Sequence, residues 1–305
     1  MLKSKFKEKF IERYIKLTDF KKFEEYSLKF LRRSIRVNTL KISIKELKNK
    51  LKDWELTQIP WCREGFWIKH KTLERRDIGN LPEHYLGYFY IQEAASMIPP
   101  VVLNPKSNDL VLDMCASPGS KTTQLASMME NKGIIIANDI SHDRLASLGI
   151  NLQRCGVSNA IITLSKAQYF NLKFDKILLD APCSGTGAIR KSLKTLLTWN
   201  PNSIKRLSNL QKKLIITAFN CLKDKGILVY STCSVEPEEN EEVIDFLLKK
   251  FKNAKLEEIK LKIKRSPAIL EFENKKYSKE IKKCLRIWPQ DNDTEGFFIA
   301  KIKKD

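Results

Sequence analysis

Two cysteine-bearing loops carry the residue types best suited to covalent chemistry. One is the DAPCSG segment at residues 180–185, which contains Cys183, and the other is the STCS segment at residues 231–234, which contains Cys233. Each loop follows an apolar run typical of a buried strand. Each is therefore predicted to lie at the carboxyl end of a strand, where open α/β sheets bind their ligands. A thiolate is a strong nucleophile, so the two loops predict addition to an electron-poor ring.

A tight turn follows the strand-like residues 110–114 and opens a helical pattern. Within its CASPGSK segment (residues 115–121), Gly119 can take a positive φ at no steric cost, and its small neighbours let a ligand approach the backbone. Lys121 stands at the helix start and suits a carboxylate. Asp139 ends the next strand, the position from which a carboxylate binds ribose hydroxyls in Rossmann-like folds. The glycine spacing matches neither the G-x-G-x-x-G motif of dinucleotide-binding proteins nor a P-loop. The turn and Asp139 together therefore predict a cofactor that carries an adenosyl group.

The two features together are consistent with methyl transfer from S-adenosylmethionine to a pyrimidine. Carbon 5 of cytosine is too weak a nucleophile to accept a methyl group unaided, but a thiolate that adds at carbon 6 turns the ring into an enamine. A free thiol has a pKa of roughly 8.5, so the attacking cysteine needs an activating environment. Asp180, three residues before Cys183, is placed to bind the N3 and amino edge of the ring. Cys155, Cys221 and Cys284 are expected to be small buried hydrophobes.

The charge of the chain favours a polyanionic partner. Its 305 residues contain 56 Lys and Arg against 36 Asp and Glu, a formal net charge of +20. The excess is concentrated in residues 1–36, 186–225 and 249–283, which flank a middle that contains more acidic residues. Such a layout is expected where nucleic acid lies across a cleft. A lysine-rich surface that is merely solvated is the alternative.

Other function classes are disfavoured by what the sequence contains. No window approaches the roughly eighteen apolar residues of a membrane span, and the start has no apolar signal core. The seven cysteines include no C-x-x-C pair and the three histidines stand far apart, so we expect no metal centre and no disulfide framework. We expect a cytoplasmic monomer.

The chain divides into two predicted domains. Residues 1–80 read as a basic α+β module that binds RNA, and residues 81–305 as the catalytic domain. In the latter, strand-like and helical patterns alternate, which predicts an α/β fold with a doubly wound, mostly parallel sheet. The expected strands are 110–114, 134–138, 160–164, 176–180, 226–232 and 296–301, and the expected helices are near 121–130, 142–155, 202–223 and 238–252.

These motifs resemble the Sun/Fmu family of S-adenosylmethionine-dependent RNA 5-methylcytosine methyltransferases. The resemblance rests on residues 113–122, on both cysteine loops and on the PEENE segment at residues 237–241. Weaker matches lie at residues 36–40, 90–96, 286–289 and 295–298. The resemblance implies a Rossmann-like methyltransferase with a seven-stranded sheet, and it is greatest to the archaeal tRNA enzymes.

The resemblance also implies roles for individual residues. Cys233 is the nucleophile and Cys183 helps to resolve the covalent adduct, whereas DNA cytosine methyltransferases attack from a Pro-Cys loop. Asp180 lies at the edge of the active site. The residues assigned to the cofactor are Cys115, Ala116, Ser117, Pro118, Gly119, Ser120, Lys121, Asp139, Arg144, Lys166 and Asp180. One departure concerns the third strand, after which the family usually places an Asp that contacts adenine, where this chain has Ser165 and Lys166.

Three readings of function follow. The first is an RNA cytosine-5 methyltransferase, with tRNA preferred over rRNA because no appended RNA-binding domain is recognisable. The second is a non-catalytic RNA-binding assembly factor that keeps the fold, against which both retained thiols argue. The third, methylation of an amino group, typically uses an Asn/Asp-Pro-Pro-aromatic loop, and residues 180–183 do not match it.

Overall fold

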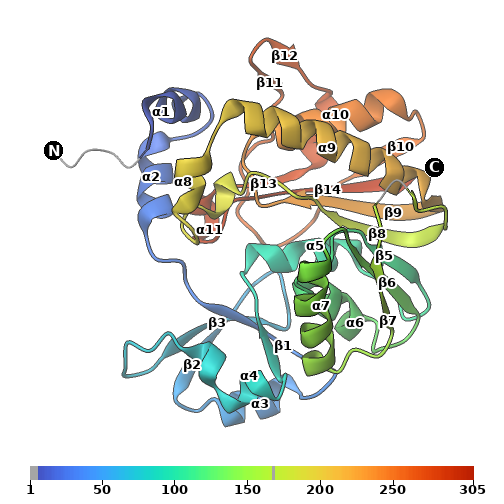
Figure 1. The fold of residues 1–305 in the computed structure, drawn as a ribbon. Coiled ribbons are helices and arrows are strands. Elements are labelled where there is room, and N and C mark those ends of the chain that lie inside the picture. The colour runs from blue at the N-terminus through green and yellow to red at the C-terminus, as the bar shows by residue number, and fades with distance from the viewer. Residues whose placement is uncertain (1–5, 167–168) are drawn as a thin grey trace.

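The protein is described here by a computed structural model that covers residues 6–166 and 169–305. The first five residues of the predicted N-terminal module lie outside the described part. Within these residues, a four-stranded sheet, an eight-stranded sheet and a two-stranded hairpin are surrounded by helices (Figure 1). A small hairpin of β11 (Glu271–Phe272) and β12 (Lys275–Lys276) projects from the larger part.

The larger sheet confirms the predicted doubly wound, mostly parallel architecture. Its strand order is β10-β14-β9-β8-β5-β6-β7, with β13 paired to β14. The five strands from β5 to β9 pair in parallel, and the remaining pairs are antiparallel. The bounds are β5 (Leu110–Asp113), β6 (Ile134–Asp139), β7 (Ala160–Leu164), β8 (Phe174–Asp180), β9 (Leu222–Thr232), β10 (Ala254–Glu257), β13 (Leu285–Ile287) and β14 (Phe297–Lys304).

The sheet has eight strands rather than the predicted seven. The difference is β13, which has only three residues and pairs antiparallel with the start of β14, Ile287 opposite Phe297. All three of its residues are buried. A segment this short has no alternating pattern to find in the sequence, so its strand conformation follows from the pairing.

Helices cover both faces of this sheet (Figure 1). One face carries α5 (Ile98–Leu103), α6 (Ser120–Met128) and α7 (His142–Cys155), and the other carries α9 (Pro201–Asn220) and α10 (Glu241–Lys250). The ends of two helices follow ordinary capping rules: Asn200 caps α9 ahead of Pro201, and Gly156 ends α7 in the left-handed region.

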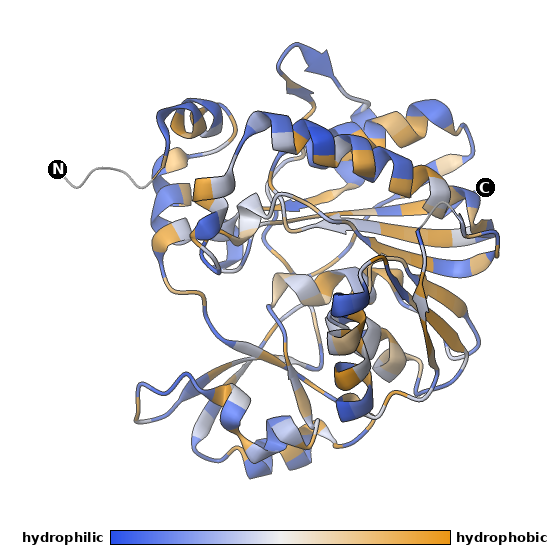
Figure 2. Cartoon of the chain, viewed as in Figure 1, coloured by the Kyte–Doolittle hydropathy of each residue, from blue (hydrophilic) through white to orange (hydrophobic). Residues whose placement is uncertain are grey.

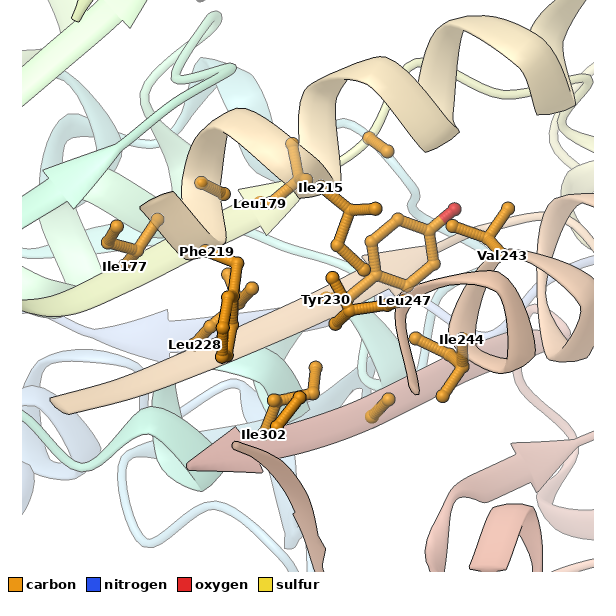
Figure 3. Packing of buried hydrophobic residues seen from close by; sticks show 14 of the residues in the cluster. Ile177, Leu179, Ile215, Phe219, Leu228, Tyr230, Val243, Ile244, Leu247 and Ile302 are labelled. Carbon is orange, nitrogen blue, oxygen red and sulfur yellow. The ribbon is translucent and has the colours of Figure 1, made fainter. Parts of the chain in front are cut away.

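The main core lies between the sheet and the α9–α10 layer. Figure 3 shows Phe219 and Ile215 of α9 facing Leu228 and Tyr230 of β9. Figure 2 shows the same division along the strands and helices, with apolar residues toward the layer boundaries and polar residues outside. This packing fixes β8 and β9, the two strands that lead into the cysteine loops.

The smaller sheet belongs to the N-terminal part. Its strands are β1 (Ser34–Val37), β2 (Trp54–Gln58), β3 (Gly65–His70) and β4 (Phe89–Ile91), in the antiparallel order β2-β3-β1-β4. Helices α3 (Ile44–Lys50) and α4 (Pro82–Tyr85) accompany it. Because β4 lies beyond the predicted boundary at residue 80 and pairs with β1, the sheet of the N-terminal part extends to Ile91.

The first two helices pack on the larger part instead of on the smaller sheet. Residues of α1 (Glu8–Ile15) and α2 (Phe20–Leu28) form an aromatic cluster in which the Phe10 ring centroid lies 5.0 Å from that of Trp199. Trp199 follows α8 (Lys194–Thr198), and Trp288 precedes α11 (Pro289–Asn292) in the same cluster. The N-terminal segment therefore spans both parts of the molecule.

Buried Arg36 joins the smaller sheet to the helix that follows the cofactor turn. Its guanidinium donates to Ser120 O (2.8 Å), to Thr123 Oγ1 (2.9 Å) and to the Gln92 side chain. Removing one partner from such a network leaves the others unsatisfied. The two parts are thus connected through the beginning of α6. Among the described residues, no helix is long and apolar enough to cross a membrane.

Phe10→Ala tests the attachment of α1. Phe10 is 1% exposed, so its truncation is expected to lower the free energy of unfolding by about 3–5 kcal/mol, as for other buried phenylalanines. Phe30→Ala is the matched control, because Phe30 is 76% exposed and its loss should change stability by less than about 0.5 kcal/mol. Urea denaturation measures both. Equal effects of the two substitutions would contradict the docking of α1.

Candidate active site

The turn between β5 and α6 is held tightly against β6. Gly119 precedes α6 with φ +101°, and a Cβ added there would lie 3.0 Å from Leu148 Cδ1. The Ala116 N–H donates to Asn138 O, and the Gly119 N–H donates to Ala116 O, both at 2.7 Å. Glycine alone adopts this conformation without strain. The turn therefore presents backbone and small side chains to any ligand above it.

Asp139 stands beside this turn at the end of β6. Its Oδ2 accepts from the Ser117 N–H (3.3 Å) and its Oδ1 from the Ser141 N–H (3.2 Å). Arg144 donates to Ser117 O (2.8 Å) and lies 3.5 Å from Asp139 Oδ2. Arg144 and Asp139 therefore both contact the backbone of the turn at Ser117.

A nucleoside-bearing cofactor fits these residues. The glycine turn, the small side chains and the carboxylate at the end of the neighbouring strand lie together. The members of this group predicted from the sequence are Cys115, Ala116, Ser117, Pro118, Gly119, Ser120 and Asp139.

Lys166 is the predicted cofactor residue that follows the third parallel strand in sequence. It follows the end of β7 with an exposed side chain, and its carbonyl accepts from Ser165 Oγ (3.2 Å). The neighbouring strand is tied down by Asn138, whose side chain accepts from the Ser165 N–H (3.0 Å) and from Thr163 Oγ1 (3.0 Å). Sequence reasoning missed Asn138, because an Asn inside an apolar strand gives no motif.

The two cysteines of the predicted catalytic pair meet at the ends of β8 and β9. Cys183 Sγ lies 3.4 Å from Cys233 Sγ. The two strands pair in parallel with Asp180 opposite Ser231, so both loops leave the same edge of the sheet. The hydrogen bond with Cys233, followed by burial, raises the pKa of Cys183 well above its ordinary value. Cys183 is therefore held as a thiol.

Asp180 and Lys121 form an ion pair at this edge. Lys121 Nζ lies 2.6 Å from Asp180 Oδ2 and donates to Ser96 Oγ (3.0 Å), while Ser231 Oγ donates to Asp180 Oδ1 (2.7 Å). Burial opposes the charge of Lys121, but the charge of Asp180 and the hydrogen bond to it outweigh burial and raise its pKa. Lys121 was expected to bind a carboxylate of the cofactor. In the structure its carboxylate partner is Asp180.

The remaining cysteines are separate from this pair. Cys155, Cys221 and Cys284 are buried, as expected for small hydrophobes. Burial raises the pKa of Cys115, which lies in the turn, above its ordinary range. Within residues 6–166 and 169–305, no group of three or more His, Cys, Asp or Glu side chains is arranged to hold a metal ion.

Two family descriptions match the chain almost end to end. The family described as 16S rRNA methyltransferase RsmB/F matches residues 100–303, and the N-terminal domain of 16S rRNA methyltransferase RsmF matches residues 3–94. The chain belongs to the RsmB/F methyltransferase family. Membership confirms the predicted resemblance, the Rossmann-like methyltransferase fold and S-adenosylmethionine as the cofactor.

Curated relatives of this RsmB/F member include tRNA and rRNA enzymes. The tRNA (cytosine(49)-C(5))-methyltransferase of Pyrococcus abyssi is 52% identical over 98% of this chain and 97% of its own length. The ribosomal RNA small subunit methyltransferase F of Photobacterium profundum is 45% identical over 90% of this chain. The match spans only 58% of that ribosomal enzyme.

Solved structures also resemble this RsmB/F member along nearly its whole length. A methyltransferase homolog protein from Pyrococcus horikoshii has a TM-score of 0.83 and 42% identity, covering 93% of this chain and 90% of that one. NSun6 from Pyrococcus horikoshii with SFG has a TM-score of 0.86 and 27% identity, covering 99% of both chains. Both likenesses include the N-terminal part, so the arrangement of the two sheets is shared.

Asp113→Asn tests the electrostatic cost of the buried end of β5. Burial raises the pKa of Asp113 to about 7. The folded protein therefore binds this proton more tightly than the unfolded chain. Stability from this group is present at low pH and is lost as pH rises from about 4 to about 7.

The loss for this single group amounts to at most about 4 kcal/mol. Asp113→Asn is expected to flatten this part of the stability profile in denaturant titrations from pH 4 to 8. Asp224→Asn, at an 88% exposed carboxylate, should leave the profile unchanged. An identical slope in the Asp113 variant and the parent would exclude Asp113 as its source.

Proposed function

We propose that this protein methylates carbon 5 of cytosine in tRNA, with Cys233 as the covalent nucleophile and Cys183 as the group that helps to release the product. The class, an RNA cytosine-5 methyltransferase dependent on S-adenosylmethionine, agrees with the family and with the 52% identical relative. The observation that carries the proposal is the 3.4 Å approach of the two sulfur atoms beside the Asp180–Lys121 pair.

The preference for tRNA rests on sequence identity. The tRNA enzyme of Pyrococcus abyssi is 52% identical to this chain, and the ribosomal enzyme of Photobacterium profundum is 45% identical. Residues 1–36, whose basic excess lies outside α1 and α2, and the basic stretch at residues 186–225 belong to neighbouring parts of the molecule, since α1 packs against residues around α8. Such a surface neutralises RNA phosphates. We place this activity in the cytoplasm.

Cys233 would act by covalent addition. Bound S-adenosylmethionine supplies an electrophilic methyl group. Attack of Cys233 Sγ on carbon 6 would form a carbon–sulfur bond and leave carbon 5 electron-rich, so that carbon 5 would bond to the methyl group and release S-adenosylhomocysteine. Loss of the carbon 5 proton then restores the double bond between carbons 5 and 6 and expels the Cys233 thiolate. Cys183, 3.4 Å from that sulfur, is placed to assist in this elimination.

Asp180 would hold the base. A carboxylate at the carboxyl end of β8 accepts a hydrogen bond from the exocyclic amino group of cytosine, which distinguishes cytosine from uracil. Ser231 and Lys121 fix the direction of Asp180 through contacts of 2.7 and 2.6 Å. The Asp180 carboxylate is thereby oriented before the base binds. Groups positioned in advance lower the activation barrier of a reaction.

Single substitutions of the two cysteines separate their roles. Cys233→Ala should abolish methylation and yield no covalent RNA adduct, because no sulfur remains to add to carbon 6. Cys183→Ala should instead accumulate an adduct that survives a denaturing gel. Both variants should bind S-adenosylmethionine within about twofold of the parent, which shows that the fold persists. The reverse pattern, with an adduct in Cys233→Ala, would contradict the assignment.

The RNA class is tested by sequencing. Bisulfite sequencing of tRNA and rRNA from cells with and without the gene should show a 5-methylcytosine that is lost from tRNA alone. Incubation of the purified protein with bulk tRNA and methyl-labelled cofactor should restore it. Loss from rRNA with intact tRNA would support the ribosomal alternative. RNA binding without any methylation would support an assembly factor.

A further inference from the structure

The carboxylate of Glu239 lies behind both cysteine loops. Glu239 is fully buried in the short 3-10 helix η5 (Pro237–Glu239). Its Oε1 accepts from the Ser184 N–H (3.0 Å), and its Oε2 accepts from the hydroxyls of Ser184 and Ser234. Ser184 follows Cys183 and Ser234 follows Cys233. One carboxylate therefore binds the residue directly after each cysteine.

A third contact ties the same carboxylate to α9. Gln211 Nε2 donates both to Glu239 Oε1 (3.1 Å) and to the carbonyl of Pro182 (2.9 Å), which directly precedes Cys183. The backbone of Glu239 is fixed as well, because the Tyr230 hydroxyl donates to its carbonyl at 2.6 Å. The carboxylate is thus held in place relative to β9 and to both loops. Its contacts fix the distance between the two loops that carry the sulfur atoms.

The charge of Glu239 acts on Cys183. It contributes to the raised pKa of Cys183, after the hydrogen bond with Cys233, burial and the charge of Cys233. A nearby anion disfavours a thiolate. The arrangement therefore favours a proton on Cys183.

We propose that Glu239 is a positioning residue for methyl transfer: its carboxylate holds the two cysteine loops together, and its charge keeps Cys183 in the thiol form so that Cys233 is the nucleophile. The proposal rests on the proposed covalent function of the cysteine pair. It adds a group that touches neither substrate nor cofactor but determines which sulfur attacks. Nothing in the two cysteine motifs themselves makes that distinction.

Other titratable groups face the same place. Burial, helped by the charge of Glu236 and opposed by the hydroxyls of Ser184 and Ser234, raises the pKa of Glu239 to about 7. Cys183 faces it from the first loop and Tyr230 from β9, while α9 contributes the neutral Gln211. Ionisation of Glu239 should therefore appear in the reactivity of Cys183 near neutral pH.

Glu239→Gln in the full-length protein removes the charge with little change in size. Iodoacetamide labelling between pH 6 and 9, read by peptide mass spectrometry, should show Cys183 labelled about threefold faster than in the parent, because its thiolate is no longer disfavoured. The kcat for a tRNA transcript should fall about tenfold, with KM and cofactor affinity unchanged. A merely structural role would not alter the labelling of one cysteine selectively.

Two further variants separate charge from hydrogen bonding. Glu239→Asp keeps the charge on a shorter side chain, so Cys183 should stay slow to label while kcat falls. Ser234→Ala removes the hydrogen bond from the second cysteine loop to Glu239 and leaves the glutamate itself in place. At pH 9, where Glu239 stays ionised, Ser234→Ala should lower kcat without accelerating Cys183, and it keeps the test informative should Glu239→Gln fold poorly. Glu242→Gln is the matched control, because Glu242 pairs with Lys212 and Lys275 away from the loops.

The outcomes distinguish this inference from the proposed function. Parental Cys183 labelling in Glu239→Gln together with parental kcat in all three variants would overturn the role of Glu239, while the parent still methylates cytosine. If the parent itself methylates no RNA, the proposed function fails. The labelling ratio of the two cysteines would then still report whether the Glu239 charge acts on Cys183.

Discussion

The parallel register between β8 and β9 determines where chemistry can occur in this fold. Asp180 lies opposite Ser231, so the loops that follow these residues leave the sheet side by side. A slip of one residue would turn every side chain of a strand to the opposite face. Leu228 and Tyr230 are buried against α9 and α10, and a slip would expose them. The approach of two sulfur atoms is therefore set by the packing of a large apolar core.

The N-terminal helices contribute to the same edge of the sheet. Arg13 donates to Glu236 (2.9 Å) and to Glu238 (2.8 Å), and Tyr14 donates to Glu236 (2.7 Å). These glutamates adjoin or belong to the helix η5 that carries Glu239. Buried Arg286, near the C-terminal end of the chain, holds the residues that flank η5. It pairs with Glu241 and donates to Val235 O (2.9 Å). The backbone behind the cysteines is thus fixed from both termini of the chain.

The sequence predicts those parts of the structure that have strong local signals. Strands β5 to β9 are apolar and well separated by helical patterns, and parallel strands place their carboxyl ends together, so the meeting of Cys183 and Cys233 follows. The ion-pair partner of Lys121 cannot be predicted from the sequence in the same way. A lysine at a helix start is equally suited to a bound carboxylate or to Asp180, fifty-nine residues away, and only the tertiary structure decides between them.

Strand β4 and the burial of Glu239 also cannot be predicted from the local sequence, because both depend on residues far away in the chain. Strand β4 has three residues and exists because it pairs with β1, some fifty positions earlier. Glu239 belongs to the PEENE segment that carries the family resemblance, but nothing in that segment predicts that this glutamate is fully buried. Burial of a carboxylate is not encoded by its neighbours in sequence. It depends on Ser184, Ser234 and Gln211, which arrive from three separate elements.

Several buried carboxylates surround the reaction site at a cost to stability. Burial raises the pKa of Glu93 to about 8 and those of Asp113 and Glu239 to about 7. Buried charges that are not fully compensated destabilise a fold, and apolar side chains of similar size would often be more stable. The interior of the sheet is apolar by comparison. Leu112, Leu178 and Leu228, from β5, β8 and β9, are fully buried within the hydrophobic clusters, whereas the buried carboxylates gather at the carboxyl edge of the sheet. The apolar body of the sheet thus supplies the rigidity that lets like charges be held close together at one edge, where a fixed electrostatic field can favour one sulfur atom over its neighbour.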